Sequence, residues 1–480
     1  MKIGLVFPNY LETFLFAPSS SHQPLGLSMI AAQLKKRGDQ VRVFDATADQ
    51  LNIYRLTKLM KKFGPDIIGI TANVSFGWKA LLTAKWLKRN FPRVKIIFGG
   101  PWPTTEFRTI LQNNAADFVV VGEGEYTIID LLDTIENGGN LEDVKGIAFK
   151  KDNDIIQTEH RALIEDLNAL PFPAWEFFPR PTKYYIGFKG SRHFPIMTSR
   201  GCPFNCINCS KFIHGYKIRK RTIENVIEEI RYLKHNFKAN EIVFIDDGFN
   251  YDIERAESLF DEIANLEFKV HIRCPSIRAD RVTPRLALKM KRAGVYDVAV
   301  GVESGTQEIV DKIGKKLDLK KVKQTIKLFK KLGILTTAFF MVGLPDENFH
   351  TIVNTKKFIM DLGVDMADVF KITPIPGTKL YELIELKGKI DQEQQKHMQF
   401  FSYQNQTFEL DNLPKEIIQY AIQDINRSFY LRLSKILYFL KHLNLRNWKW
   451  YLNAFFLIIM RVFGNQREIK PEEISDILKK

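Results

Sequence analysis

The stretch Cys202-Pro-Phe-Asn-Cys206-Ile-Asn-Cys209 holds three of the four cysteines in the chain. Three thiolates on one short loop can bind three irons of a cubane iron–sulfur cluster and leave the fourth iron open to a ligand from outside the protein. A structural zinc site would instead need a fourth protein ligand, for which His193 and His214 are the nearest candidates. Four cysteines are too few for a disulfide framework in a chain of 480 residues. The spacing therefore favours an iron–sulfur cluster, with zinc as the alternative.

The composition is that of an ordinary globular protein, long enough for two or three domains. Of the 480 residues, 45% are hydrophobic and 26% are charged, and Met1–Pro8 runs straight into a strand-like segment without a secretion signal. Few, clustered cysteines are typical of a reducing cytoplasm, where an oxygen-sensitive cluster survives. The net charge of +15 indicates an anionic partner, which nucleic acid, a membrane surface or an acidic substrate would each satisfy. We therefore expect a cytoplasmic protein.

The N-terminal part of the chain alternates strand-like and helix-like segments. Apolar strand patterns lie at Ile3–Phe7, Val41–Phe44, Ile67–Thr71, Val94–Phe98 and Phe118–Val121, and helical patterns lie at Leu25–Lys36, Gln50–Lys62 and Gly77–Asn90. This alternation predicts a doubly wound parallel sheet, a Rossmann-like α/β fold whose ligands bind beyond the carboxyl ends of the strands. The residues at those ends are candidate ligand contacts, although glycines also serve tight strand-to-helix turns: Thr71, Gly99, Gly100, Gly122 and Gly124.

A second α/β unit follows a proline-rich junction. After a hairpin-like segment at Gly146–Ile156, the prolines of Leu167–Trp175 neither continue a helix nor pair within a central strand. Strand patterns then recur at Phe194–Thr198, Ile242–Ile245, Lys269–Arg273, Asp297–Val300, Leu335–Phe340 and Val369–Thr373. With Thr222 and Thr283-Pro284 as helix starts, six such units predict a partial (β/α)6 barrel, in which chemistry gathers at the carboxyl ends of the strands.

The C-terminal segment is basic and aromatic. From Arg427 to Gln466 there is no Asp or Glu, and the longest apolar run, Ala454–Met460, is far shorter than the roughly 20 residues that span a bilayer. Such a helical extension can dock on the barrel with its basic side chains in solvent, or it can lie on an anionic membrane surface. We expect docking, with peripheral contact to the inner face of the membrane as the alternative and nucleic acid as the least favoured partner.

These features resemble the radical S-adenosylmethionine (SAM) superfamily, in the branch whose barrel follows a cobalamin-binding domain. The cysteine stretch is similar to the superfamily's cluster loop, where the open iron binds the amino and carboxylate groups of SAM. The N-terminal part resembles the cobalamin domain in Pro24-Leu25-Gly26, Ala31–Lys35, Val43-Phe44-Asp45, Gly99-Gly100-Pro101 and Gly122–Glu125. In a departure from the family, Thr47 and Gln50 stand where cobalt-ligating domains have histidine and glycine. We expect cobalamin to bind without a protein histidine on cobalt; the alternative is a domain that has lost its cofactor.

The resemblance also implies which barrel residues contact SAM: Asp246, Asp247, Arg278, Glu303, Gly343 and Pro345. Carboxylates at the strand ends would bind the SAM ammonium or ribose, and Gly343 would let adenine approach the backbone. Each position has a structural alternative: a capped turn at the acidic pair, a salt bridge at Glu303 and a Gly-Leu-Pro turn at Gly343. Cys274, near the end of its strand, reads as a small buried hydrophobe, and the alternative is a catalytic hydrogen donor.

The resemblance implies four regions: a cobalamin-binding-like domain at 1–145, a linker and hairpin at 146–187, a radical SAM core at 188–410 and a helical extension at 411–480. Its cofactors would be a 4Fe–4S cluster, SAM and cobalamin, with flavodoxin or ferredoxin as electron donor. We expect methyl transfer to an unactivated carbon of a small-molecule or lipid-like substrate. The alternatives are oxidative cyclisation or rearrangement and, outside enzymes, a cobalamin sensor. A tRNA methylthiotransferase is disfavoured because residues 1–201 contain no cysteine for a second cluster.

Overall fold

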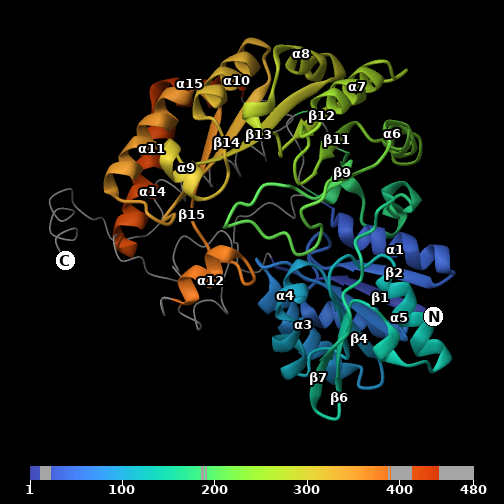
Figure 1. Cartoon of the computed structure of the whole chain (residues 1–480). Coiled ribbons are helices and arrows are strands. Elements are labelled where there is room, and N and C mark those ends of the chain that lie inside the picture. Colours follow the sequence, from blue (N-terminus) through green and yellow to red (C-terminus); the bar gives the residue numbers. More distant parts are fainter. Residues whose placement is uncertain (11–22, 185–188, 190–191, 387–389, 391–412, 443–480) are drawn as a thin grey trace.

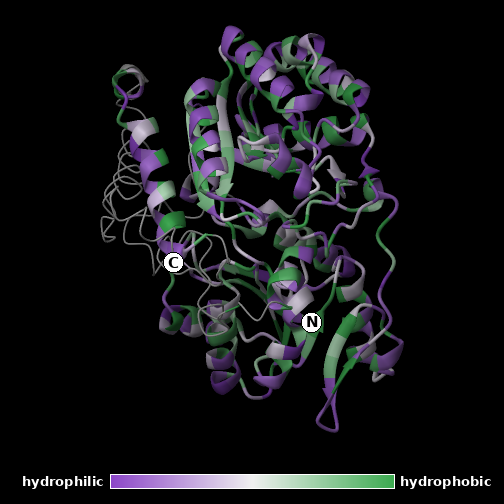
Figure 2. Ribbon diagram, turned by 60° about the vertical axis from the view of Figure 1, so that its left-hand side comes forward, coloured by the Kyte–Doolittle hydropathy of each residue, from purple (hydrophilic) through white to green (hydrophobic). Residues whose placement is uncertain are grey.

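The structure, a computed structural model, describes residues 1–10, 23–184, 189, 192–386, 390 and 413–442. Figure 1 shows two α/β units, the N-terminal one in blue and the later one in green to orange. Each unit has a large hydrophobic core of its own. Apolar residues run along the strands, and polar residues gather on the outer faces of the helices (Figure 2). This division is the expected result of burying one face of each helix against a sheet.

The N-terminal unit is a seven-stranded sheet in the order β2-β1-β3-β4-β5-β6-β7. Its parallel strands confirm the predicted doubly wound fold: β1 (Lys2–Phe7), β2 (Gln40–Asp45), β3 (Ile67–Thr71), β4 (Lys95–Gly99) and β5 (Phe118–Val120). The helices are α1 (Leu25–Arg37), α2 (Ile53–Phe63), α3 (Gly77–Asn90), α4 (Pro101–Gln112) and α5 (Thr127–Asn137). The predicted hairpin forms β6 (Ile147–Lys151) and β7 (Asp154–Gln157), and β6 continues the sheet antiparallel to β5.

The turn after β4 shows how the sequence shapes the carboxyl edge of this sheet. Gly100 has a φ of 108°, and a Cβ there would lie 2.7 Å from the carbonyl oxygen of Ala72. Only glycine fits such a position without strain. Pro101 then begins α4, where its missing N–H costs no helical hydrogen bond. Gly100 therefore lets the ends of β3 and β4 approach each other closely.

The second unit is a six-stranded parallel sheet in the order β8-β11-β12-β13-β14-β15, which confirms the partial barrel. Its strands are β8 (His193–Ile196), β11 (Glu241–Phe244), β12 (His271–Cys274), β13 (Val295–Glu303), β14 (Leu335–Val342) and β15 (Met366–Lys371). Its helices are α6 (Ile223–Phe237), α7 (Ile253–Ala264), α8 (Pro284–Ala293), α9 (Gln307–Lys312), α10 (Leu319–Lys331), α11 (Phe349–Leu362) and α12 (Lys379–Glu385). The side chains of Thr222 and Thr283 cap α6 and α8, as predicted.

The barrel strands divide their side chains between two faces, because successive residues of a strand point to opposite sides. On β14, Ala338, Phe340 and Val342 are buried in the core under the helices, whereas Phe339 and Met341 alternate with them and are half-buried. The alternate set faces the barrel interior. The same alternation on every strand leaves the interior free for groups other than the hydrophobic core.

The described part of the C-terminal region packs on the barrel. α14 (Lys415–Tyr430), which precedes α15 (Leu433–His442), buries Ile417, Ile425 and Phe429 in the barrel core. The Tyr430 hydroxyl donates to the carbonyl of Ala367 on β15 at 2.8 Å. Docking is thus observed for the start of the basic segment, and residues 443–466 of that prediction lie outside the described residues. Within the described ranges, no helix is both long and apolar enough to cross a bilayer.

Candidate active site

The three-cysteine stretch lies in a loop that a short ladder closes at its base. β9 (Ser199–Arg200) pairs antiparallel with β10 (Arg219–Lys220), and residues 201–218 between them form the cluster loop. Gly201 turns into this loop with a φ of 92°, and a Cβ there would lie 2.1 Å from the carbonyl oxygen of Lys217. The ladder and this glycine turn hold the two ends of the cluster loop side by side.

Within the cluster loop, Cys202 and Cys206 are half-buried, and the Cys209 side chain reaches solvent. Burial raises the pKa of the Cys206 thiol, although the charge of Lys315 opposes the rise. Because only thiolates ligate iron, formation of a cluster on these cysteines would release protons.

The donor set fits a cluster better than a single metal ion. Among the residues that the structure describes, no three His, Cys, Asp or Glu side chains form a group that could hold one metal ion. A cubane spreads its thiolates over three irons, so its ligands need not converge on a single point. His214 hydrogen-bonds Asp247, and His193 is buried in β8, so neither histidine completes a zinc site with the cysteines. The three thiols therefore fit a 4Fe–4S cluster with one open iron.

Asp246 follows β11, and its carboxylate is used in hydrogen bonds within the protein. Its carboxylate accepts hydrogen bonds from the amide of Thr198 at 2.6 Å, from the Thr198 hydroxyl and from the Ser199 hydroxyl at 2.8 Å. Burial raises the pKa of Asp246, although these bonds oppose the rise. Both carboxylate oxygens are thus used to hold the chain just before the cluster loop.

Asp247, the second residue of the acidic pair, contacts the cluster loop directly. It accepts a hydrogen bond from the Gly201 amide at 2.8 Å and lies 2.9 Å from Nδ1 of His214. Burial by itself would raise the pKa of Asp247, but the hydrogen bonds with His214 and Gly201 bring it below its ordinary value. Asp247 therefore carries a negative charge beside the cysteines at neutral pH.

Glu303 ends β13 with a φ of 73°. Residues with a side chain rarely adopt this conformation, and those that do are often found at functional sites. Its carboxylate pairs with the ammonium group of Lys315. Gly301 makes room for this pair, because a Cβ there would lie 2.7 Å from Nζ of Lys315. Glu303 thus stands at the predicted strand end, in the salt bridge that the sequence left as its alternative.

Arg278 links the barrel to the cluster loop. Its guanidinium pairs with both oxygens of Asp280, at 2.8 and 3.1 Å, and donates to the carbonyl of Lys316. The same guanidinium lies 3.4 Å from the ring centre of Phe204, which stands between the first two cysteines of the cluster loop. Arg278 therefore supports the cluster loop through a cation–π contact.

Gly343 turns the chain after β14 with a φ of 91°. Its amide and that of Leu344 donate to one carboxylate oxygen of Glu347, at 2.8 and 3.0 Å, and Pro345 is half-buried in the same turn. The second oxygen of Glu347 has no hydrogen-bond partner among the described residues, and burial raises the pKa of Glu347 to about 7. The Gly-Leu-Pro turn is thus built around a buried carboxyl group.

Cys274 lies apart from the cluster loop cysteines, in the hydrophobic core on the helix-covered face of β12. Its neighbour Ile272 lies in the same core, whereas Arg273 between them points to the barrel interior by strand alternation. Burial raises the pKa of the Cys274 thiol well above its ordinary value. The side chain therefore packs as a small apolar group, directed away from the barrel interior.

A cavity of about 430 Å³ lies where the two units meet. The N-terminal sheet contributes all the residues predicted at its carboxyl edge: Thr71, Gly99, Gly100, Gly122 and Gly124. The barrel unit contributes Arg200 at the base of the cluster loop, His214 within the loop and Ile245 after β11. One cavity thus touches the predicted cobalamin edge and the cluster loop together, with a mainly apolar wall that is typical of cofactor sites.

The segment that lacks a cobalt-ligating histidine has a structural task. Thr47 is buried, and its hydroxyl donates to the carbonyl of Pro8 at 2.8 Å. Asp45 accepts a hydrogen bond from the Tyr184 hydroxyl at 2.7 Å, and burial raises the pKa of Asp45 to about 6. Neither Asp45 nor Thr47 lines the cavity, and the only histidine among its described lining residues is His214.

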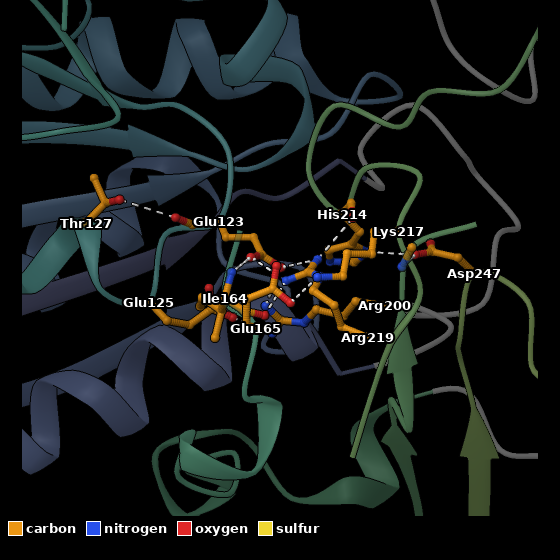
Figure 3. A network of polar contacts seen from close by, with 11 residues as sticks. Glu123, Glu125, Thr127, Ile164, Glu165, Arg200, His214, Lys217, Arg219 and Asp247 are labelled. Carbon is orange, nitrogen blue, oxygen red and sulfur yellow. Dashed lines mark hydrogen bonds and ion pairs between the residues drawn. The ribbon is translucent and has the colours of Figure 1, made fainter. Parts of the chain in front are cut away.

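A buried ion network ties the N-terminal unit to the base of the cluster loop (Figure 3). Glu123, just after β5, pairs with Arg200 and with Arg219 at 2.8 Å each, and Glu125 pairs with Arg200. All four side chains are at most 9% exposed. Burial by itself would raise the pKa of Glu123, but the hydrogen bond from Arg219 and the charge of Arg200 lower it. The network holds the cluster loop against the edge that lines the cavity.

The sequence interpretation missed the charged partners in this site. In Gly122–Glu125 it used the glycines, whereas the two glutamates make the contacts to the barrel. A signal was present, because Arg200 stands directly before the glycine that opens the cluster loop. It also gave no role to Glu347 or Lys315, each of which contacts a residue that it had singled out.

Comparisons with known proteins agree with this geometry. Residues 196–359 match the radical SAM superfamily, and residues 15–132 match the B12 binding domain. An uncharacterized methyltransferase of Pyrococcus horikoshii is 33% identical, covering 80% of this chain and 83% of its own. An anaerobic magnesium-protoporphyrin IX monomethyl ester cyclase of Rubrivivax gelatinosus is 28% identical over 82% of this chain and 71% of its own. The cobalamin-dependent SAM radical enzyme OxsB shares the fold, with a TM-score of 0.73 and 17% identity over 100% of this chain and 75% of that chain.

The chain therefore belongs to the radical SAM proteins that carry a B12-binding domain, and it is an enzyme. This confirms the resemblance on which the sequence interpretation relied. The cofactors of this family are a 4Fe–4S cluster, SAM and cobalamin. The residues present fit them, because the cluster loop supplies three thiols and the cavity has a glycine-rich edge.

Proposed function

We propose that the protein is a cobalamin-dependent methyltransferase that acts on an unactivated carbon of a small-molecule or lipid-like substrate. The observation that supports this most directly is the single cavity lined by the glycine edge of the N-terminal sheet and by the cluster loop region. A methyl donor and a radical source must both reach one substrate carbon, so their sites must open into one space. Two adjoining but separate pockets would not serve that reaction.

The protein's own residues bind and orient the reactive groups. Cys202, Cys206 and Cys209 would hold the cluster. The cavity edge with Gly122 would hold cobalamin, because the space where a Cβ would stand there has no protein atom within 4 Å and a large ring can approach the backbone. When bound, the cluster supplies the electron that cleaves SAM to a 5′-deoxyadenosyl radical, and cobalamin supplies the methyl group. The apolar wall of the cavity would exclude water from the space beside the glycine edge.

The residues at the barrel strand ends are the proposed SAM contacts: Asp247, Arg278, Glu303, Gly343 and Pro345. Asp246 would act differently, as a positioning residue, because its two oxygens already accept bonds from Thr198 and Ser199. Asp247 follows β11 and bonds the amide of Gly201 at the start of the cluster loop, and Glu303 ends β13 and pairs with Lys315, next to the turn that contacts the same loop. Carboxylates there can accept hydrogen bonds from the ammonium or ribose hydroxyls of SAM.

The test is an anaerobic incubation of reconstituted protein with methyl-labelled SAM and a cell extract. The proposal predicts a product heavier by one methyl group in place of one hydrogen, with the label on carbon. A matched control protein, in which all three cluster loop cysteines are alanine, should form neither this product nor 5′-deoxyadenosine. Label found only on oxygen or nitrogen would contradict the proposal, because transfer to those atoms needs no radical.

A second candidate is oxidative cyclisation without methyl transfer. This candidate is supported by the anaerobic magnesium-protoporphyrin IX monomethyl ester cyclase, which is 28% identical over 82% of the chain. The same incubation separates the two, since a cyclase product would be lighter by two hydrogens and unlabelled.

The proposed partners follow from the chemistry. A reduced flavodoxin or ferredoxin would supply electrons, and the oxygen-sensitive cluster fits a reducing cytoplasmic location. Peripheral contact with a membrane would require the C-terminal basic segment, most of which lies outside the described residues.

A further inference from the structure

A strongly basic segment lies next to the cluster loop. Residues 312–331 contain nine lysines and a single acid, Asp318, for a net charge of +8 within a chain whose total is +15. The segment covers the end of α9, a turn and all of α10. The proposed reaction uses none of these lysines, apart from Lys315, which pairs with Glu303.

The turn of this segment packs directly on the cluster loop. The carbonyl of Ile313 accepts a hydrogen bond from the amide of Ile207 at 3.0 Å. Gly314 has a φ of 76°, and a Cβ there would lie 2.5 Å from the carbonyl oxygen of Asn205 and 3.7 Å from Cα of Cys206. Only glycine permits such an approach. The basic turn therefore packs against the two residues that flank Cys206, which would ligate the cluster.

Three lysines that follow this contact in the chain are exposed, and no described ion pair offsets their charge. Lys316, Lys320 and Lys321, the loop-side lysines, are exposed, and in the part of the chain that the structure describes no ion pair involves them. Lys312 and Lys315, by contrast, pair with Glu308 and Glu303.

The loop-side lysines also stand where helix electrostatics disfavours them. Lys320 and Lys321 lie in the first turn of α10, the positive end of the helix dipole, where acidic residues stabilise. Asp318 accepts hydrogen bonds from their backbone amides, so its carboxylate serves as the helix cap. The charges of Lys320 and Lys321 therefore do not stabilise the start of this helix.

We propose that the loop-side lysines form the docking surface for an acidic, low-potential one-electron carrier protein of the flavin or iron–sulfur class, which reduces the cluster. This rests on the proposed function. One electron passes from the reduced carrier to the oxidised cluster, the carrier is oxidised by one electron, and no atom is transferred. A basic patch beside the turn that contacts the cluster loop can steer an acidic carrier to that side of the cluster.

The same helix offers a matched control. Lys327, Lys330 and Lys331 are also exposed lysines of α10, but they lie toward its other end, about 15 Å along the axis at 1.5 Å per residue. The loop-side variant carries Lys316→Glu, Lys320→Glu and Lys321→Glu, and the control variant carries Lys327→Glu, Lys330→Glu and Lys331→Glu. Both change the net charge equally, so only position differs. A neutral variant with glutamine at the loop-side positions guards against misfolding.

The experiment measures the Kd of the reconstituted holoenzyme for a bacterial flavodoxin and for a low-potential ferredoxin by biolayer interferometry, at low and high salt. It also measures SAM cleavage driven by either carrier or by dithionite. The loop-side variant should bind both carriers at least about tenfold more weakly and lose carrier-driven cleavage, with dithionite-driven cleavage unchanged. The glutamine variant should show a smaller loss of the same kind, and the control variant should match the wild type.

Equal weakening in the loop-side and control variants would overturn the proposal, because net charge alone would then explain it. Unchanged carrier affinity in the loop-side variant, with loss of binding to vesicles that contain phosphatidylglycerol, would also overturn it and assign the patch to a membrane surface. Wild-type enzyme that fails to cleave SAM even with dithionite would instead refute the proposed function, and the docking proposal would fall with it.

Discussion

Replacing Glu123 with alanine tests the connection between the two units. Glu123 is 3% exposed and faces Arg219, which is 1% exposed, and Arg200, which is 9% exposed. Without Glu123, Arg200 keeps Glu125, but Arg219 keeps only backbone carbonyl acceptors. Leaving a buried charge without its partner costs about 3–5 kcal/mol. Because Arg200 remains paired, we expect a loss at the lower end, about 3 kcal/mol of the free energy of unfolding.

Urea unfolding followed by tryptophan fluorescence measures this loss, with Glu165→Ala as the control. Glu165 pairs with Lys217 at 2.7 Å in the same region (Figure 3), but the two side chains are 64% and 67% exposed. An exposed pair contributes less than about 1 kcal/mol. Similar losses for the two variants, or a loss below about 1 kcal/mol for Glu123→Ala, would refute the reasoning that burial makes this network matter.

The difference in unfolding free energy between the wild type and Glu123→Ala should depend on pH in one direction. The pKa of Glu123 lies below its ordinary value of 4.5 in the folded protein. A carboxyl with a lowered pKa stabilises the fold above its unfolded pKa, and this stabilisation is lost as pH falls through the folded one. This difference in unfolding free energy should therefore have its full value at pH 7 and should decrease only below about pH 4.5. A difference that grew as the solution became more acidic would contradict this assignment.

Three further predictions concern the cofactors and the barrel. Alanine at all three cluster loop cysteines should abolish iron binding and SAM cleavage together, whereas Cys274→Ala should keep its iron, as measured by iron content and product analysis. Burial raises the pKa of Glu347 from 4.5 to about 7. The protonated carboxyl therefore stabilises the fold fully below pH 4.5, and this stabilisation is lost as pH rises through 7. Glu347→Gln should remove this pH-dependent loss, which is at most about 3 kcal/mol, in thermal melts compared at pH 5 and pH 8. Bound cobalamin should show a base-off spectrum that His214→Ala leaves unchanged, and a histidine-on spectrum would contradict this.

The fold could be predicted because its signals are local. An apolar run and a helical pattern predicted Ile67–Thr71 and Gly77–Asn90 with the bounds that β3 and α3 have. The same local signals predicted the caps at Thr222 and Thr283, since a hydroxyl side chain before a helical pattern can accept a free amide. β13 runs to Glu303, beyond its predicted end at Val300, because pairing with β14 continues past Gly301.

The site could be predicted only where a residue acts through its own local pattern. The spacing of the three loop cysteines indicates a cluster site, and Gly100 before a proline indicates a turn. The pairing of Glu123 with Arg219 joins residues far apart in the chain, and no local period encodes which carboxylate meets which guanidinium. For the same reason the sequence did not show that Asp246 is occupied by its neighbours.

The central claim is that one cavity brings a radical source and a methyl donor to the same substrate carbon. The most direct measurement is the ratio of SAM-derived products in a single anaerobic reaction with reduced, cobalamin-loaded enzyme and methyl-labelled SAM. We expect 5′-deoxyadenosine and S-adenosylhomocysteine in about equal amounts, with the label on a carbon of the product. 5′-Deoxyadenosine without S-adenosylhomocysteine, with an unlabelled product lighter by two hydrogens, would contradict methyl transfer and favour cyclisation.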